Sequence, residues 1–146
     1  MDALEDTLAL IRRYEGLYLS PYLCPAGVPT IGYGSTRYDD GTPVALTDPA
    51  ITAYQAEELL LHTVKATYLP AVLTLCPVDL TPGRLAALVD FCYNLGASAL
   101  RSSTLRKRVN AGDWGAVPAE LRKWDKAGGR VLRGLTLRRN AEAALV

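Results

Sequence analysis

The sequence predicts an α+β fold in which a small β-lobe interrupts a mainly helical chain. Apolar residues recur at helical spacing in residues 2–14 and again after residue 52. Between them, residues 17–38 alternate tyrosine and β-branched residues with glycine and proline, a pattern typical of short strands and tight turns. The chain has 146 residues, 49% of them hydrophobic and 21% charged, which are ordinary values for one globular domain.

The expected layout is a single domain over residues 1–146. Its β-lobe covers about residues 15–50, and its helical lobe covers about residues 51–146 together with the N-terminal helix. A cleft between two such lobes is the natural place for a ligand.

The first predicted helix covers residues 2–14. Leu4, Leu8 and Ile11 share one face, acidic residues stand at its start, and Gly16 is placed to end it. Residues 17–38 then predict two or three short strands.

The helical lobe is predicted from capping signals and apolar stripes. A helix starts at Thr52 and runs towards Thr67, and Pro70 is expected to kink or end it. Thr81 and Pro82 start the next helix, which stops near Gly96. Further helices are predicted at residues 103–110, 114–124 and 135–145.

Charge is distributed unevenly along the chain. Residues 1–100 hold 5 basic and 11 acidic side chains, whereas residues 101–146 hold 11 basic and 4 acidic ones. A basic segment of this kind suggests an anionic partner, either nucleic acid, a membrane surface or a cell-wall polymer. The alternative is a solvated helical surface with no partner. No nucleic-acid recognition motif accompanies the basic segment, so nucleic acid is not the expected partner.

The three cysteines, Cys24, Cys76 and Cys92, are expected to be free thiols, and Cys92 is expected to pack in the core. No metal site is expected, because no Cys-x-x-Cys is present and His62 is the only histidine. No run is long and apolar enough for a membrane span, and the N-terminus is acidic where a secretory signal would be basic. We therefore expect no stable membrane insertion and a cytoplasmic protein.

Glu15 is the candidate acid of the chain. It lies where the first helix meets the β-segment, next to Tyr14 and Leu17. A carboxyl group that is desolvated by apolar neighbours can keep its proton, which is what a general acid requires. The alternative is a solvated glutamate at a helix end.

The residues that follow Glu15 resemble the phage-type lysozymes of glycoside hydrolase family 24, the endolysins. Members of that family carry Glu-x8-(Asp or Cys)-x5-Thr, and here Glu15, Cys24 and Thr30 have this spacing. Thr30 opens the Thr-Ile-Gly-Tyr-Gly segment, which is similar to the family's turn. The resemblance extends over nearly the whole chain and includes residues 87–96, 102–105, 110–113, 124–129 and 134–142.

The resemblance implies a lysozyme-like fold and a muramidase that cuts the β-1,4 bond between N-acetylmuramic acid and N-acetylglucosamine in peptidoglycan. It implies that Glu15 protonates the glycosidic oxygen, that Thr30 helps to hold the attacking water, and that Cys24 occupies the second catalytic position. An arginine of the C-terminal helix, Arg138 or Arg139, is expected to pair with Glu15. No cofactor is implied.

Cys24 stands where the commoner family residue is aspartate. A cysteine with an ordinary pKa of about 8.5 is mostly neutral at pH 7, and a neutral thiol would serve poorly as a base. Two roles stay open: a thiolate that orients or activates water, with inversion, or a nucleophile, with retention. The resemblance favours inversion. A redox switch that pairs Cys24 with Cys76 or Cys92 is a further hypothesis.

The implied setting is phage lysis of a bacterial host. A monomeric enzyme would wait in the host cytoplasm until a hole-forming phage protein, a holin, released it to the cell wall. Two other functions remain open at this point. The chain could be a wall-binding module with a degenerate site, or a cationic membrane disruptor that acts through residues 101–146.

Overall fold

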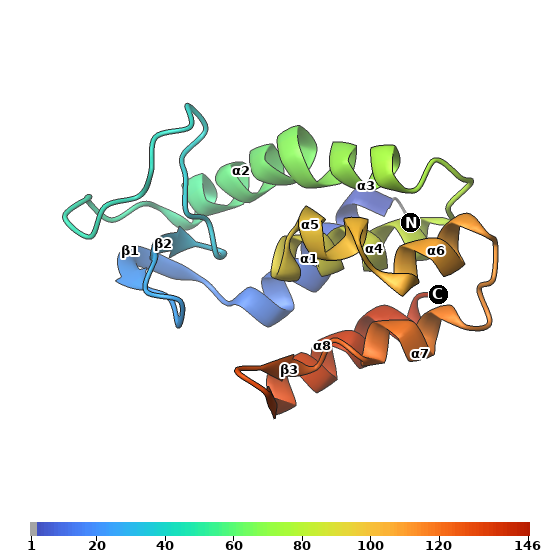
Figure 1. Ribbon diagram of the computed structural model, residues 1–146. Helices are drawn as coiled ribbons and strands as arrows, with labels where there is room; N and C mark the ends of the chain where they lie inside the picture. Colours follow the sequence, from blue (N-terminus) through green and yellow to red (C-terminus); the bar gives the residue numbers. More distant parts are fainter. Residues whose placement is uncertain (1–2) are drawn as a thin grey trace.

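The computed structural model describes residues 3–146, and Asp2 of the first predicted helix lies outside them. The β-hairpin and its following loop lie at one end of the molecule, and the helices form the rest (Figure 1). Helix α1 (Ala3–Glu15) buries Leu8, Leu10 and Ile11 in the helical core. Gly16 follows it with a φ of 73°, a backbone conformation that favours glycine, and so ends the helix as predicted.

The β-lobe is built on two antiparallel strands, β1 (Tyr18–Leu23) and β2 (Pro29–Gly32). Isolated bridges from Ile31 to Ser35 and from Arg37 to Pro43 extend the pairing into the loop that follows. Ile31 and Val44 are buried with Leu59 of the next helix in a small apolar cluster. This cluster attaches the β-lobe to the helical lobe.

A long helical segment runs along one side of the molecule (Figure 1). It consists of α2 (Ala53–Thr63), a π-helical turn η1 (Val64–Tyr68) and α3 (Leu69–Leu75). Thr52 caps α2 in a capping box with Gln55, as its sequence spacing predicts. Of the two predicted outcomes at Pro70, a kink or an end, the end is wrong, because the helical segment runs on to Leu75. Pro70 lies in the first turn of α3, where its missing N–H is tolerated, so the helix continues.

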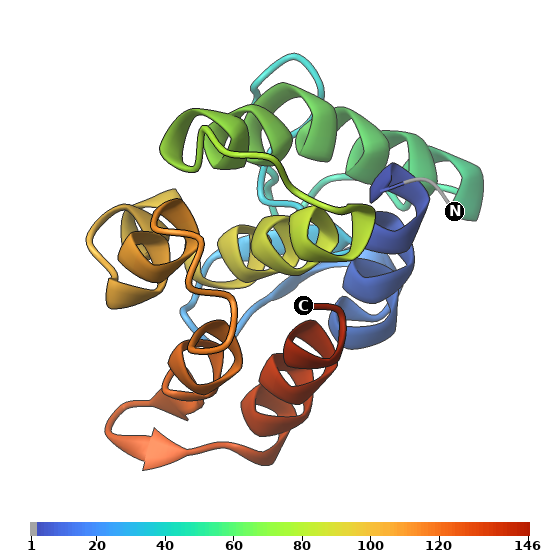
Figure 2. The ribbon, with the colours of Figure 1, turned by 90° about the vertical axis from the view of Figure 1, so that its right-hand side faces the viewer.

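Helix α4 (Pro82–Leu95) is the centre of the helical lobe, and the other helices surround it in Figure 2. Every residue from Ala86 to Cys92 is buried. α4 packs against α1, α3 and α8. Because this stretch is buried all round, each polar side chain in it needs a partner inside the protein.

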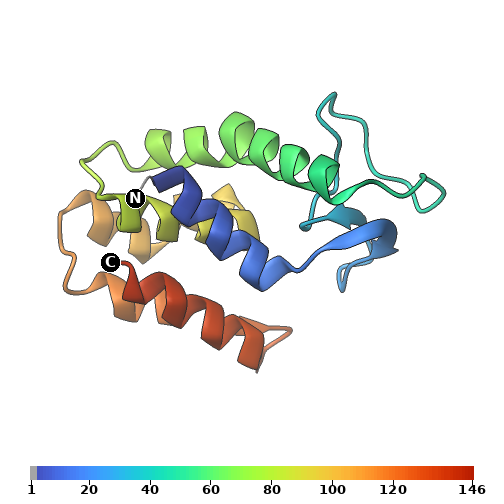
Figure 3. The same cartoon turned by 180° about the vertical axis from the view of Figure 1, so that it is seen from behind.

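The C-terminal part continues with short elements. They are α5 (Ala97–Arg101), α6 (Thr104–Asn110), α7 (Val117–Arg122), β3 (Lys126–Ala127), β4 (Arg130–Val131) and α8 (Arg133–Ala144). The predicted helix at 114–124 is too long, because the chain from 113 to 116 forms turns and Pro118 stands in the first helical turn. α5 and the small β3–β4 hairpin were not predicted. Seen from behind, α1 and α8 lie on the same side of the molecule (Figure 3).

Cys76 and Cys92 are 1% and 0% exposed in the helical core, and all three cysteines are free. The prediction that Cys92 packs as a core residue is confirmed. Burial raises the pKa of the Cys92 thiol to about 12, so this thiol is unreactive at neutral pH. A bridge from Cys24 to either buried cysteine would require the core to open.

Candidate active site

Glu15 is the last residue of α1, so the end of that helix places its carboxyl group beside the turn that follows β2. Its side chain is 21% exposed. A Cβ atom built on Gly34 would lie 2.7 Å from Oε2 of Glu15. Gly34 also has a φ of 83°, so glycine is needed there for both space and backbone conformation.

Arg138 holds the other oxygen of Glu15. Its Nη1 donates a hydrogen bond of 2.7 Å to Oε1 of Glu15. Its Nε and Nη2 donate to the two carboxylate oxygens of Asp90, at 2.9 and 2.7 Å. Asp90 is fully buried on α4, so this fork fixes the guanidinium group in one orientation. Arg138, not Arg139, is therefore the arginine that pairs with Glu15.

The Arg138 guanidinium stays charged although it is 4% exposed. Burial lowers its pKa, but the hydrogen bonds and charge of Asp90, with those of Glu15, raise the pKa of Arg138 above its ordinary value. Glu15 therefore faces a permanent, immobile positive charge.

Cys24 follows β1 and begins the turn that connects the two strands. Gly27 N–H donates to the Cys24 carbonyl at 2.8 Å, and Cys24 N–H donates to the Val28 carbonyl at 3.1 Å. The backbone N–H groups of Val28 and Ala26 face the thiol. Together with the Thr30 hydroxyl they hold the pKa of Cys24 below its ordinary value, against a smaller opposing effect of desolvation. The turn thus favours the thiolate.

Thr30 lies on β2 and is 2% exposed. Its hydroxyl donates to the Val28 carbonyl at 2.8 Å and also contacts the Cys24 side chain. Because its own proton is committed to Val28, the Thr30 oxygen can accept a hydrogen bond from another group.

Tyr22 connects the two parts of the candidate site. Burial is the main cause that raises the pKa of its hydroxyl, and electrostatic interactions with Tyr18, Glu15 and Cys24 raise this pKa further. Glu15 and Cys24 thus both lie near one tyrosine of β1. Thr30 contacts the Cys24 side chain, so Tyr22 is the residue through which Glu15 and this pair are related.

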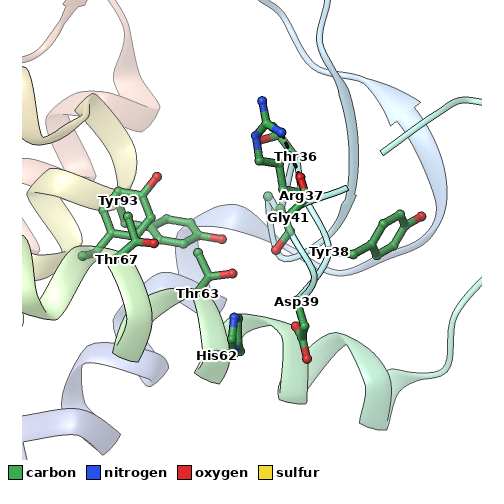
Figure 4. A pocket seen from close by; sticks show the side chains of 12 residues that line it. Thr36, Arg37, Tyr38, Asp39, Gly41, His62, Thr63, Thr67 and Tyr93 are labelled. Carbon is green, nitrogen blue, oxygen red and sulfur yellow. Dashed lines mark hydrogen bonds between the residues drawn. The ribbon is translucent and has the colours of Figure 1, made fainter. Parts of the chain in front are cut away.

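A pocket of about 430 Å³ lies between the loop after β2 and the helix α2–η1. Figure 4 shows Thr63, Thr67 and Tyr93 on the helical side of this pocket, opposite Thr36 and Arg37 of the loop. Gly34, which abuts Glu15, also lines it. A second pocket of about 350 Å³, lined by Glu15 and Arg138, lies towards the start of α8. Glu15 therefore lines one pocket and abuts, at Gly34, a residue that lines the other.

Tyr93 lines the first pocket, and its hydroxyl donates to the Tyr33 carbonyl. His62 is exposed and also lines the pocket, a placement that the sequence did not indicate.

Asp90 is the main residue that sequence reasoning missed. Its signal was present, because a charged residue inside the apolar run Leu88-Val89-Asp90-Phe91-Cys92 needs a buried partner.

Among residues 3–146, no group of three His, Cys, Asp or Glu side chains could hold a metal ion. No helix within the same residues is long and apolar enough to cross a membrane.

Comparison with known proteins gives the family. The model of the family described as phage lysozyme matches residues 12–142. An endolysin of Acyrthosiphon pisum secondary endosymbiont phage 1 is 41% identical over 145 residues, which cover 97% of this chain and 94% of that protein. An endolysin of Bacillus phage PZA is 40% identical over 93% of this chain, which spans 51% of that longer protein.

A solved structure agrees with these relatives. The endolysin from Escherichia coli O157:H7 phage FAHEc1 superposes with a TM-score of 0.87 at 38% identity, over 99% of this chain and 92% of that one. A SAR-endolysin of Escherichia phage Mu also matches, at 32% identity over 97% of this chain and 78% of that protein. The chain belongs to the phage lysozyme family.

Proposed function

We propose that Glu15 is the general acid of a muramidase and that Cys24 and Thr30 position its water. As a phage lysozyme, the chain is a glycoside hydrolase that cleaves the bacterial cell wall. The observation that carries the assignment is the placement of Glu15, which lines a pocket and is held by the buried pair of Arg138 and Asp90.

The acid step follows from how the two oxygens of Glu15 are used. Oε1 accepts from Arg138, so the transferable proton belongs on Oε2, the oxygen beside Gly34. When Oε2 gives this proton to the glycosidic oxygen, Glu15 becomes an anion next to the Arg138 cation. Arg138 therefore stabilises the product of proton transfer without having to move.

The water step belongs to the hairpin. The Cys24 thiolate, favoured by the N–H groups of its turn, accepts a proton from water, and the Thr30 oxygen accepts the other hydrogen of that water. The water attacks the anomeric carbon from the face opposite Glu15, the bond to the leaving sugar breaks, and the configuration inverts. A thiolate held by the backbone N–H groups of Val28 and Ala26 is a base and positioning group in this proposal, not a nucleophile.

The substrate is peptidoglycan, cut between N-acetylmuramic acid and N-acetylglucosamine. The proposal places the bond in the cleft between the β-lobe at about residues 15–50 and the helical lobe. The basic residues of 101–146 then face a polymer that carries stem-peptide carboxylates. The enzyme acts as a monomer, reaches the wall with the help of a holin, and needs neither nucleic acid nor a cofactor.

Product analysis tests the proposal. Purified sacculi are incubated with the protein under reducing conditions, and the soluble fragments are analysed by mass spectrometry. We expect fragments that end in reducing N-acetylmuramic acid, with the α-anomer formed first. Glu15→Gln should reduce their rate of release at least about 10²-fold, whereas Glu58→Gln, a change at an exposed helical position, should not alter it.

Three outcomes would contradict the proposal. Fragments with a 1,6-anhydro end would mean that no water attacks. Binding to sacculi without any fragments would favour a wall-binding module. Killing of cells that survives Glu15→Gln, together with killing by a peptide of residues 101–146, would favour a cationic membrane disruptor.

A further inference from the structure

The candidate acid is connected to an unusual number of buried charges. Behind Glu15, the side chains of Asp90, Arg138, Arg139 and Glu142 are between 0% and 4% exposed. With Glu15 they make three carboxyl groups and two guanidinium groups. Once Glu15 has given up its proton, the cluster with all five groups ionised would carry one uncompensated negative charge, which is costly in a protein interior.

The excess charge is located at Glu142. Its Oε2 accepts from Nη2 of Arg139 at 2.8 Å. Its Oε1 is buried and has no donor among the described residues. The Glu142 carboxyl is also in hydrogen-bonding contact with Asp90, whose two oxygens already accept from Arg138. Two carboxyl groups in contact share a proton more readily than they both ionise.

We propose that Glu142 is a positioning residue, a neutral carboxylic acid that donates its proton to Asp90 and thereby fixes Arg138 against Glu15. The order of contacts is Glu142 to Asp90, Asp90 to Arg138 and Arg138 to Glu15. With this proton on Glu142, the cluster of three acids and two bases is neutral once Glu15 has become an anion. The inference rests on the proposed function, because Glu15 is the group that the cluster holds in place.

The surroundings of Glu142 agree with a neutral acid. Burial raises its pKa to about 10, the contact with Asp90 acts in the same direction, and Arg139 only partly opposes both. The other titratable group that faces it is the Cys92 thiol of α4, which is neutral because burial raises its pKa to about 12. Arg139 meets the ring of Phe91 at 5.3 Å, so part of its charge is directed away from Glu142.

Two substitutions separate a proton donor from a space filler. The amide of Glu142→Gln can donate to Asp90 and accept from Arg139, as the neutral acid does. Glu142→Met has a similar length but no donor. For sacculus cleavage we expect kcat within about threefold of wild type for the glutamine variant. The methionine variant should lose at least about tenfold in kcat with little change in KM.

A second readout does not depend on activity. Glu142 has an ordinary pKa of 4.5 when unfolded and about 10 when folded. Between these values the folded protein holds one more proton than the unfolded chain, so stability falls as the pH rises. The unfolding constant of wild type should therefore rise about tenfold per pH unit relative to that of Glu142→Gln. Denaturant titrations between pH 6 and pH 9 measure both slopes.

Each result decides one point. If the stability of wild type and that of Glu142→Gln change with pH at the same slope, Glu142 does not hold a proton in the folded protein. Equal losses of kcat in the glutamine and methionine variants would overturn the role of its hydrogen bond in positioning Arg138. If the slopes differ as expected but Glu15→Gln still cleaves sacculi, the buried proton stands and the assignment of Glu15 fails.

Discussion

Cys24 occupies a turn that stabilises a negatively charged side chain, whether this is a thiolate or a carboxylate. The N–H groups of Ala26 and Val28 face the side chain, and the Thr30 hydroxyl lies beside it. Aspartate at the first position of such a turn accepts the same backbone donors. The geometry of the turn therefore suits an aspartate at this position as well as a cysteine.

We predict that ionisation of Cys24 determines how the rate of sacculus cleavage rises with pH on the acid side of its pH profile, the acid limb. Cleavage should rise with pH as the thiolate forms, at a pH below the ordinary thiol value because the turn lowers the pKa of Cys24. Cys24→Asp should stay active and move this limb towards the ordinary aspartate pKa of about 3.9. Cys24→Ser should lose about 10²-fold, because a hydroxyl does not ionise in this range.

The measurement is the rate of sacculus cleavage between pH 4 and pH 9 for the three proteins, in reducing buffer. A serine variant as active as wild type would refute a thiolate base. An aspartate variant whose acid limb coincides with that of wild type would show that another group sets the limb.

Gly34 is predicted to be needed for the position of Glu15. In Gly34→Ala, the new Cβ would lie 2.7 Å from Oε2 of Glu15, and Arg138 prevents the carboxyl group from yielding freely. We expect at least about a tenfold loss of cleavage. We also expect a loss of about 1–2 kcal/mol in the free energy of unfolding, because alanine is strained at positive φ.

Gly112→Ala is the matched control for this prediction. Gly112 has a similar φ of 72°, but nothing lies within 4 Å of the place that its new Cβ would take. It should lose comparable stability, measured by denaturant titration, and keep full activity. If both variants lose activity equally, backbone strain is responsible rather than contact with Glu15.

Among the elements, the segment from α2 to α3 contains a π-helical turn that the periodicity of its apolar residues does not predict. Its apolar spacing is compatible with an α-helix, and Pro70 predicts a break. The chain instead forms a π-helical turn, in which Leu69 N–H donates to the Val64 carbonyl. This turn carries Thr67 and Tyr68, which both line the first pocket. π-helical turns are often found at functional sites, and no local sequence signal distinguishes one from an α-helical turn.

Helix ends were predictable where a side chain or a glycine specifies them. Thr52, Thr81 and Ser103 each accept a hydrogen bond from a backbone N–H in the first helical turn. The elements that were missed are short: α5 has 5 residues, and β3 and β4 have 2 each. Elements of this size have no measurable period, so tertiary packing decides them.

The candidate site was predictable only in part, for a similar reason. Glu15, Cys24 and Thr30 stand close in sequence, so a motif contains them. Arg138 and Arg139 are adjacent on one helix and are both buried, and only the packing of α8 on α4 determines which one reaches Glu15. The partners of Asp90 lie 48 residues or more along the chain, beyond any local pattern.

At the scale of the molecule, only some of the basic residues in the C-terminal part of the sequence are exposed on the surface. Several basic residues of the C-terminal part are used internally, since Arg138 and Arg139 are buried and Arg106 donates to the Leu75 carbonyl. Other cations are exposed and form no ion pair with the described residues. They are Arg101, Lys107, Arg122, Lys126, Arg130 and Arg133. These exposed cations are the ones available to an anionic wall.

The attraction of these cations for the wall is predicted to be visible as a salt dependence. Exposed charges are screened over about 8 Å at physiological ionic strength, so cleavage of sacculi should fall as salt rises from about 0.05 to about 0.5 M. Replacing Lys126 and Arg130 of the β3–β4 hairpin by glutamine should lower the rate at low salt about threefold and flatten the salt curve. Lys65→Gln, an exposed cation in the acidic part, is the matched control and should leave the curve unchanged. Identical curves for all three proteins would mean that these two cations serve solubility alone.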